Sequence, residues 1–176
     1  MNLEDLKNIK VPTVMIKKVF PPKKSIYTVD TTGDGKIDSV KLVALNVIMP
    51  FGIPAKEDLG DIDVEKIDPS EHGKLLLDGE QIDISKGASN INLIKESLRV
   101  YHKGESFSFE DALGGKMGGR TIALGDEILV VFKIDESFLA KLTEGKHTLS
   151  LESDKIPNIE IGFELTKSNM NQTFTP

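Results

Sequence analysis

Alternation between apolar and polar residues recurs in several short stretches of this chain. It is most regular in Ile159–Leu165, and looser versions run through Ile37–Met49 and Leu98–His102. A period of two places successive side chains on opposite faces of a strand, so each stretch predicts a half-buried strand. Ile128–Phe132 is apolar throughout, which is typical of a central strand covered on both faces.

Two glycine-containing dipeptides predict hairpins between such strands. Asp78-Gly79 separates the apolar runs Leu75–Leu77 and Ile82–Ile84, and Asp-Gly is a strong signal for a tight two-residue turn. Lys103-Gly104 stands in the same position between two further alternating stretches. The second half of the chain is therefore expected to be rich in antiparallel strand pairs.

Helical signals are few. Asp135–Gly145 is the best candidate, because it starts with a residue type that caps helices and ends in a glycine that can stop one. Ile26–Val29 indicates a short strand, and Val11–Phe20 is expected to be extended. Many short strands with one or two short helices predict a mainly β protein, an antiparallel β-sandwich of immunoglobulin-like or jelly-roll-like type.

The length of 176 residues suits one domain. We expect a single β domain over residues 1–166, followed by a flexible tail over residues 167–176. Pro50–Ser70 is irregular and longer than an ordinary connection. This leaves open an arrangement in which residues 1–70 form an N-terminal lobe beside a sandwich of residues 71–166.

Part of the chain resembles immunoglobulin-like surface modules. The resemblance covers Lys74–Leu165 and is carried by the sequences SLRVYHKGE (Ser97–Glu105) and LAKLTEGKHTLSLE (Leu139–Glu152). It rests on the strand pattern, so it implies a sandwich fold and no particular activity.

Composition and charge narrow the choice of partners. The net charge of −6 disfavours contact with phosphate backbones, so we expect no nucleic-acid partner. No apolar run approaches the ~20 residues of a membrane-spanning helix, so we expect a soluble protein. Without cysteine there can be no disulfide or thiolate site. The first ten residues lack the pattern of a signal peptide.

The polar stretch Asp30–Asp38 resembles the calcium loop of EF-hands and dockerins, in which oxygens at positions 1, 3, 5, 7 and 9 converge on one ion. Gly35 stands at position 6, where such a loop turns sharply. Calcium takes six to eight oxygen ligands, which fits the residue types at these positions. The predicted ligands are Asp30, Thr32, Asp34, the carbonyl of Lys36, and Asp38.

This loop departs from the EF-hand pattern at position 12, where Lys41 replaces the expected glutamate, and its flanks predict strands instead of helices. The departure argues against a calcium sensor and favours a calcium-stabilised hairpin. Water, a second oxygen of Asp38, or an acid from Pro50–Ser70 such as Asp61 or Asp63 could complete the ligand shell. The alternative is a polar turn without metal.

Three functions are compatible with these features. The first is a non-enzymatic structural or binding module, stabilised by calcium, in a cell-surface or virion assembly with a protein partner or with copies of itself. The calcium loop suggests an extracellular or virion location. The second is a small hydrolase that uses acidic residues, which needs a deep pocket of clustered acids. The third is a carbohydrate-binding module, which the low aromatic content disfavours.

Overall fold

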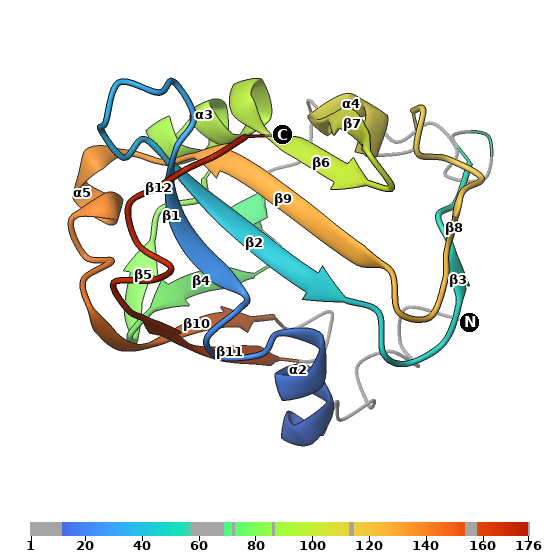
Figure 1. Ribbon diagram of the computed structural model, residues 1–176, viewed down its shortest axis with the longest axis horizontal. Coiled ribbons are helices and arrows are strands. Elements are labelled where there is room, and N and C mark those ends of the chain that lie inside the picture. The colour runs from blue at the N-terminus through green and yellow to red at the C-terminus, as the bar shows by residue number, and fades with distance from the viewer. Residues whose placement is uncertain are drawn as a thin grey trace.

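The computed structural model describes residues 12–55, 57, 69–71, 73–85, 87–112, 115–153 and 158–175 (Figure 1). Over these residues the protein is mainly β, as the sequence predicts, and its strands form three sheets, none of which closes on itself. Most of the irregular segment Pro50–Ser70 lies outside the described residues.

The largest sheet has six strands in the order β12-β1-β2-β9-β6-β7. All neighbours are antiparallel except β12, which runs parallel to β1. The apolar run Ile128–Phe132 lies in β9, between β2 and β6, which confirms its predicted central place. The strands are β1 (Ile26–Asp30), β2 (Ser39–Leu45), β6 (Arg99–His102), β7 (Glu105–Ser108), β9 (Glu127–Lys133) and β12 (Gln172–Thr173).

A second sheet has four antiparallel strands in the order β11-β10-β4-β5. Both predicted hairpins are present, β4–β5 around Asp78-Gly79 and β6–β7 around Lys103-Gly104. All four turn residues have φ between +52° and +82°, which two-residue hairpin turns require. The remaining strands are β4 (Lys74–Leu77), β5 (Glu80–Ile82), β10 (Gly145–Glu152), β11 (Ile159–Leu165) and the small pair β3 (Phe51–Gly52) and β8 (Thr121–Ile122).

The described residues contain four α-helices, where the sequence predicts one or two. They are α2 (Thr13–Val19), α3 (Ser89–Ser97), α4 (Phe109–Ala112) and α5 (Glu136–Leu139), with a 3-10 turn at Pro69–Glu71. The expectation that Val11–Phe20 is extended is wrong for Thr13–Val19: Pro12 precedes the helix with a φ of −60°, and the helix rests on β11 and β2. None of these helices is long and apolar enough to cross a membrane.

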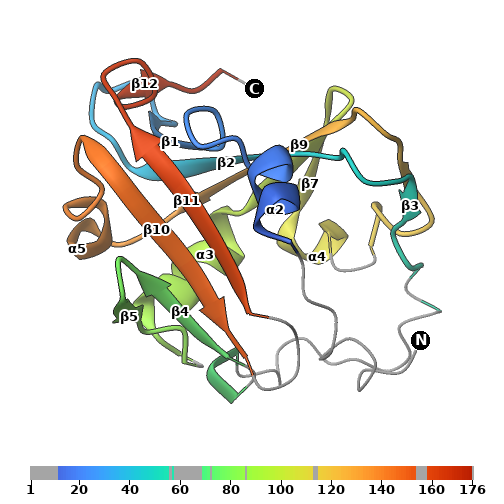
Figure 2. The same cartoon turned by 90° about the horizontal axis from the view of Figure 1, so that it is seen from below.

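The two larger sheets are steeply inclined to each other. Figure 1 shows the broad face of the six-stranded sheet, whereas Figure 2 shows the broad face of β10 and β11. Side chains of both sheets fill one core, in which Ile26 and Val40 from one sheet lie with Phe163 and Leu165 from the other. Strands from the first and second halves of the chain therefore share one buried cluster.

A smaller cluster lies under the far end of the six-stranded sheet. It joins Val100 and Phe107 of the β6–β7 hairpin to Met117, with Ile128 and Val130 of β9 packed against it. The inward side chains of β9 thus alternate with outward ones, and the outward face carries Glu127, Leu129 and Val131. This outward face is the one that Figure 1 presents to the viewer.

The end of the chain, predicted from the sequence to be a flexible tail, lies against the six-stranded sheet. Its two-residue strand β12 pairs with β1, and the amide of Asn171 donates a hydrogen bond to the hydroxyl of Thr28 at 3.1 Å. Beyond β12 the chain crosses the outward face toward β6 (Figure 1). Phe174 is thereby placed against Tyr101, with ring centres 5.3 Å apart.

Candidate functional site

The predicted calcium loop is the connection between β1 and β2. Asp30 ends β1 and Ser39 begins β2, so the loop leaves one strand and enters its antiparallel neighbour. Gly33 and Gly35 have φ of +77° and +83°, in the left-handed region that glycine adopts without strain. The turns at these glycines direct backbone amides of the loop toward Asp30.

The carboxylate of Asp30 accepts four hydrogen bonds from this loop. Its Oδ1 receives the amide of Thr32 at 2.9 Å, the Thr32 hydroxyl at 3.1 Å and the amide of Gly33 at 2.7 Å, and its Oδ2 receives the amide of Gly35 at 2.7 Å. Burial of this 3 % exposed residue opposes ionisation, but the hydrogen bonds outweigh it and lower the pKa of Asp30. Asp30 is thus an ionised residue around which the loop is organised.

Asp38, at the other end of the loop, has different partners. Thr31 donates its amide to Oδ1 at 3.0 Å and its hydroxyl to Oδ2 at 2.8 Å, and the ammonium of Lys133 from β9 lies 3.2 Å from Oδ2. Partial burial opposes ionisation of Asp38, but these contacts outweigh it and lower its pKa. A lysine ammonium is therefore the cation beside Asp38 in this structure.

The other three predicted ligand residues, Thr32, Asp34 and Lys36, are exposed. Oδ1 of Asp34 accepts the amide of Lys36 at 2.8 Å. Within the described ranges, Oδ2 of Asp34 has no hydrogen-bond partner. This oxygen and the carbonyl of Lys36 are thus available to a ligand from solvent.

In the part of the chain that the structure describes, no three acidic or histidine side chains lie close enough to hold a metal ion. Amide, hydroxyl and ammonium donors satisfy Asp30 and Asp38 separately, so repulsion between carboxylates does not by itself require a cation here. In kind, the carboxylate, hydroxyl and carbonyl oxygens of the loop are those that calcium prefers. Calcium binding stays a prediction, and Asp61 and Asp63 lie outside the described residues.

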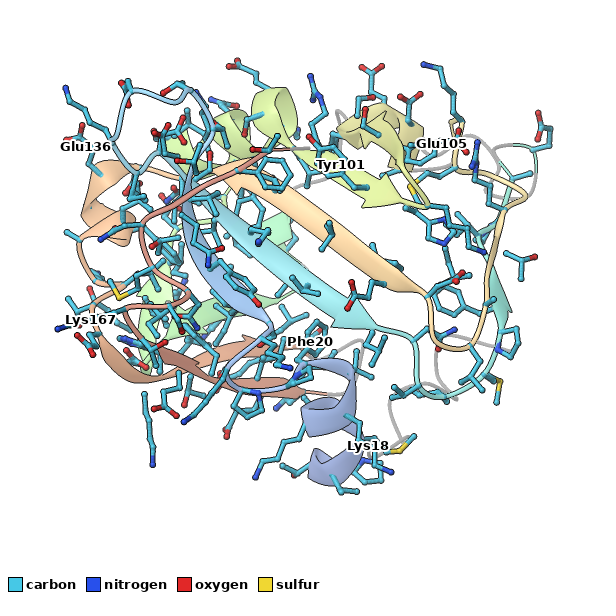
Figure 3. All side chains as sticks on the ribbon, viewed as in Figure 1. Lys18, Phe20, Tyr101, Glu105, Glu136 and Lys167 are labelled. Carbon is cyan, nitrogen blue, oxygen red and sulfur yellow. The ribbon has the colours of Figure 1, made fainter. Side chains whose placement is uncertain are left out.

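A groove of about 480 Å³ lies on the outward face of the six-stranded sheet. No single stretch of the sequence indicates this groove, because its residues come from three strands, a hairpin turn and the chain end. Tyr101 of β6, which Figure 3 labels, lines the groove together with Glu127 and Leu129 of β9. The other lining residues are His102, Lys103, Gly104, Ser106, Phe174 and Thr175.

Asp126 anchors the hairpin turn beside this groove. Its Oδ2 lies 3.0 Å from Nε2 of His102 and 2.9 Å from Nζ of Lys103, and accepts the amide of Ala123 at 2.7 Å. These three contacts lower the pKa of Asp126 to about 2. Because Asp126 neutralises Lys103, the charge left on the groove lining is that of Glu127.

Both tyrosines of the chain belong to the outward face of this sheet, one on β1 and one on β6. Phe174 meets Tyr101 edge to face, with an angle of 61° between the rings. The ammonium of Lys41 lies 4.0 Å from the ring centre of Tyr27 and 6.0 Å from that of Phe174. Burial lowers the pKa of Lys41. Lys41, which occupies position 12 of the calcium-loop pattern, is therefore part of an aromatic cluster on the sheet.

This geometry gives little support to the two alternative functions, a small hydrolase and a carbohydrate-binding module. A hydrolase needs clustered acids, and Glu127 is the one acidic residue among those that line the groove. A carbohydrate platform needs coplanar exposed rings, whereas Tyr101 and Phe174 are steeply inclined. Neither function has a supporting feature among the residues that the structure describes.

No protein-family model matches this chain, and no characterised protein is significantly similar to it.

Proposed function

We propose that the protein is a non-enzymatic structural or binding module, an antiparallel β-sandwich in which calcium bound at Asp30–Asp38 stabilises the β1–β2 hairpin. The observation that carries the proposal is the winding of the loop around Asp30, produced by Gly33 and Gly35 in left-handed conformations. A loop closed in this way gathers carboxylate, hydroxyl and carbonyl oxygens in one short segment, and oxygens of these kinds are the ligands that calcium takes.

The ligands in this proposal are Asp30, Thr32, Asp34, the carbonyl of Lys36, and Asp38. Oδ2 of Asp30 accepts one hydrogen bond and Oδ2 of Asp34 accepts none from the described residues, so both retain acceptor capacity. Asp38 can join only by exchanging the ammonium of Lys133 for the ion. The ion would supply charge neutralisation and a rigid link across the loop, with no part in any reaction.

Binding of this kind stabilises the folded state by RT ln(1 + [Ca]/Kd), or about 2.7 kcal/mol at a hundredfold excess over Kd. Thr32 contributes a neutral oxygen, and Lys133 competes for Asp38, so a Kd of roughly 0.1–1 mM, as in extracellular modules, is expected. Such a site fills where calcium is abundant. This supports a place in a cell-surface or virion assembly, with a protein partner or copies of the same chain.

The sandwich part of the proposal is supported by the shared core. Leu77 of β4 and Phe163 of β11 lie in one cluster with Ile26 and Val40 of the six-stranded sheet. Two sheets that bury their inner faces against each other are the defining feature of this architecture. The inclination of the sheets in Figures 1 and 2 points to an orthogonal variety of it.

Calorimetric titration of the full chain with calcium and, separately, magnesium tests the proposal. We expect one site per chain that binds calcium and discriminates against magnesium, because magnesium demands a smaller octahedral shell and gives up water reluctantly. Asp34→Ala removes a carboxylate whose one partner among the described residues is the Lys36 amide, and is expected to abolish the heat of binding. An absence of saturable calcium binding by the unmodified chain would overturn the proposal.

A further inference from the structure

We propose that the groove on the outward face of the six-stranded sheet binds a cationic side chain of arginine type, presented by a protein partner. The inference rests on the proposal that this protein is a binding module, and it is independent of the calcium site. It is carried by the charge, the rings and the position of the groove.

The charge of the groove is set by one residue. Glu127 is exposed and faces the groove from the first position of β9. Lys103, the one lysine among the described lining residues, lies 2.9 Å from Asp126 outside the groove, so that pair contributes no net charge. The nearby ammonium of Lys41 rests on the ring of Tyr27, 4.0 Å from its centre, and no ion pair joins Glu127 to a lysine or arginine within the described residues. Glu127 is thus left to a cation from outside.

The walls of the groove fit a planar cation. Tyr101 and Phe174 are half-buried, and their edge-to-face packing leaves ring surface turned toward the groove. A guanidinium group can stack on an aromatic ring while it donates a pair of hydrogen bonds to a carboxylate. The more strongly hydrated lysine ammonium gains less from such a site, so arginine is the preferred side chain.

The groove is also open to a macromolecule. Ser106 belongs to β7, which is the last strand of the six-stranded sheet, and Gly104 lies at the hairpin tip. Gly104 and Ser106 are both exposed, so a partner that approaches this edge can insert one side chain between the hairpin turn and Phe174. A volume near 480 Å³ exceeds what one guanidinium fills, which leaves room for the adjoining peptide.

The test is an NMR titration of the full chain with three capped tripeptides: acetyl-Gly-Arg-Gly-amide, its lysine analogue and its citrulline analogue, which is the uncharged isostere of arginine. We expect the arginine peptide to shift the amide signals of Tyr101, Leu129 and Phe174, with the lysine peptide weaker and citrulline ineffective. Glu127→Gln is expected to weaken arginine binding about three- to tenfold, as loss of one partly exposed ion pair predicts. Glu160→Gln, an exposed glutamate on β11, is the matched control.

Two results would overturn the inference. One is citrulline binding as strong as arginine binding; the other is an unchanged affinity in Glu127→Gln. If that variant fails to fold, the affinity of the unmodified chain for the arginine peptide is measured at two salt concentrations instead. Binding through Glu127 must weaken between about 20 and 200 mM salt, and an affinity that does not change would also overturn the inference. Calcium-dependent melting measured on the same sample reports separately on the proposed calcium module, so the two failures are distinguishable.

Discussion

The carbonyl oxygen of Asp30 accepts a hydrogen bond from the backbone amide of Phe174, with 2.9 Å between oxygen and nitrogen. The carboxylate of Asp30 organises the proposed calcium loop, and its carbonyl holds the chain end whose ring forms one side of the groove. One residue therefore touches both proposed sites, by two chemically separate groups.

This relationship gives a prediction for Phe174→Ala. The substitution removes the ring and keeps the backbone amide that bonds to Asp30. We expect affinity for the arginine peptide to fall several-fold while the calcium-induced rise in melting temperature stays the same. If the calcium response is lost along with peptide binding, the ring and not the amide connects the two sites.

Leu165→Ala tests whether the two halves of the chain unfold together. Leu165 of β11 is completely buried in the cluster that contains Ile26 and Val40, so its truncation is expected to cost about 2–5 kcal/mol of unfolding free energy. NMR signals from β1 and from β11 are expected to disappear in one transition at a lower temperature, with Glu160→Gln as the exposed control on the same strand. Signals from β1 that outlast those from β11 would favour a separate lobe over residues 1–70.

Asp78→Asn tests the hydrogen bonds of the Asp78 carboxylate, which fasten the β4–β5 turn to β10. Oδ2 of Asp78 lies 2.7 Å from Nδ1 of the buried His147, and its Oδ1 accepts the amide of Thr148 at 2.7 Å. Partial burial opposes ionisation, but these contacts outweigh it and lower the pKa of Asp78. Because asparagine tolerates the φ of +52° found at this position, the substitution removes mainly the charge.

The pH dependence of this variant follows from the direction of the shift. A carboxyl whose pKa is lower in the folded state stabilises the fold above its unfolded pKa, near 3.9, and loses that contribution as the pH falls. Denaturant unfolding is expected to show Asp78→Asn about 0.5–1 kcal/mol less stable at pH 7, because water screens this half-exposed carboxylate, with a smaller gap at pH 3. An equal gap at both pH values would mean that the charge of Asp78 is irrelevant to stability.

Lys133→Gln asks whether Asp38 is a calcium ligand. The ammonium of Lys133 lies 3.2 Å from Oδ2 of Asp38 and competes with any ion that this carboxylate could bind. Removing it is expected to tighten calcium binding about threefold or more, measured by calorimetry at low salt. Lys146→Gln, an exposed lysine on β10 in the other sheet, is the control. An unchanged affinity in Lys133→Gln would show that calcium is held by Asp30, Asp34 and their neighbours alone.

The strand pattern was readable from sequence where local signals agree. Ile159–Leu165 coincides with β11, and Asp78-Gly79 and Lys103-Gly104 form their hairpins because residues with positive φ leave few alternatives. The helices were harder to predict from the sequence. Thr13–Val19 contains four β-branched residues among seven, which locally favour a strand, and its helical form depends on packing against β11 and β2.

Of the two candidate sites, one could be predicted from the sequence and the other could not. The loop Asp30–Asp38 could be identified because its residues are contiguous, but the pairing of Asp38 with Lys133 could not, since Lys133 is distant in sequence and adjacent only in the sheet. The groove was invisible for the same reason: Tyr101, Glu127 and Phe174 meet only after β6 and β9 pair and the chain end crosses them. The spacing of residues along the chain predicts sites that lie within one segment. It does not predict sites whose residues come together only when distant strands pair.

The central claim is that calcium stabilises this fold through the loop at Asp30–Asp38. Its most direct test is the melting temperature of the full chain in EDTA and in about 10 mM calcium, compared with Asp34→Ala and with 10 mM magnesium. The account predicts a rise of several degrees with calcium for the unmodified chain, and no rise for Asp34→Ala or for magnesium. A melting temperature that is the same in EDTA and in calcium would contradict it.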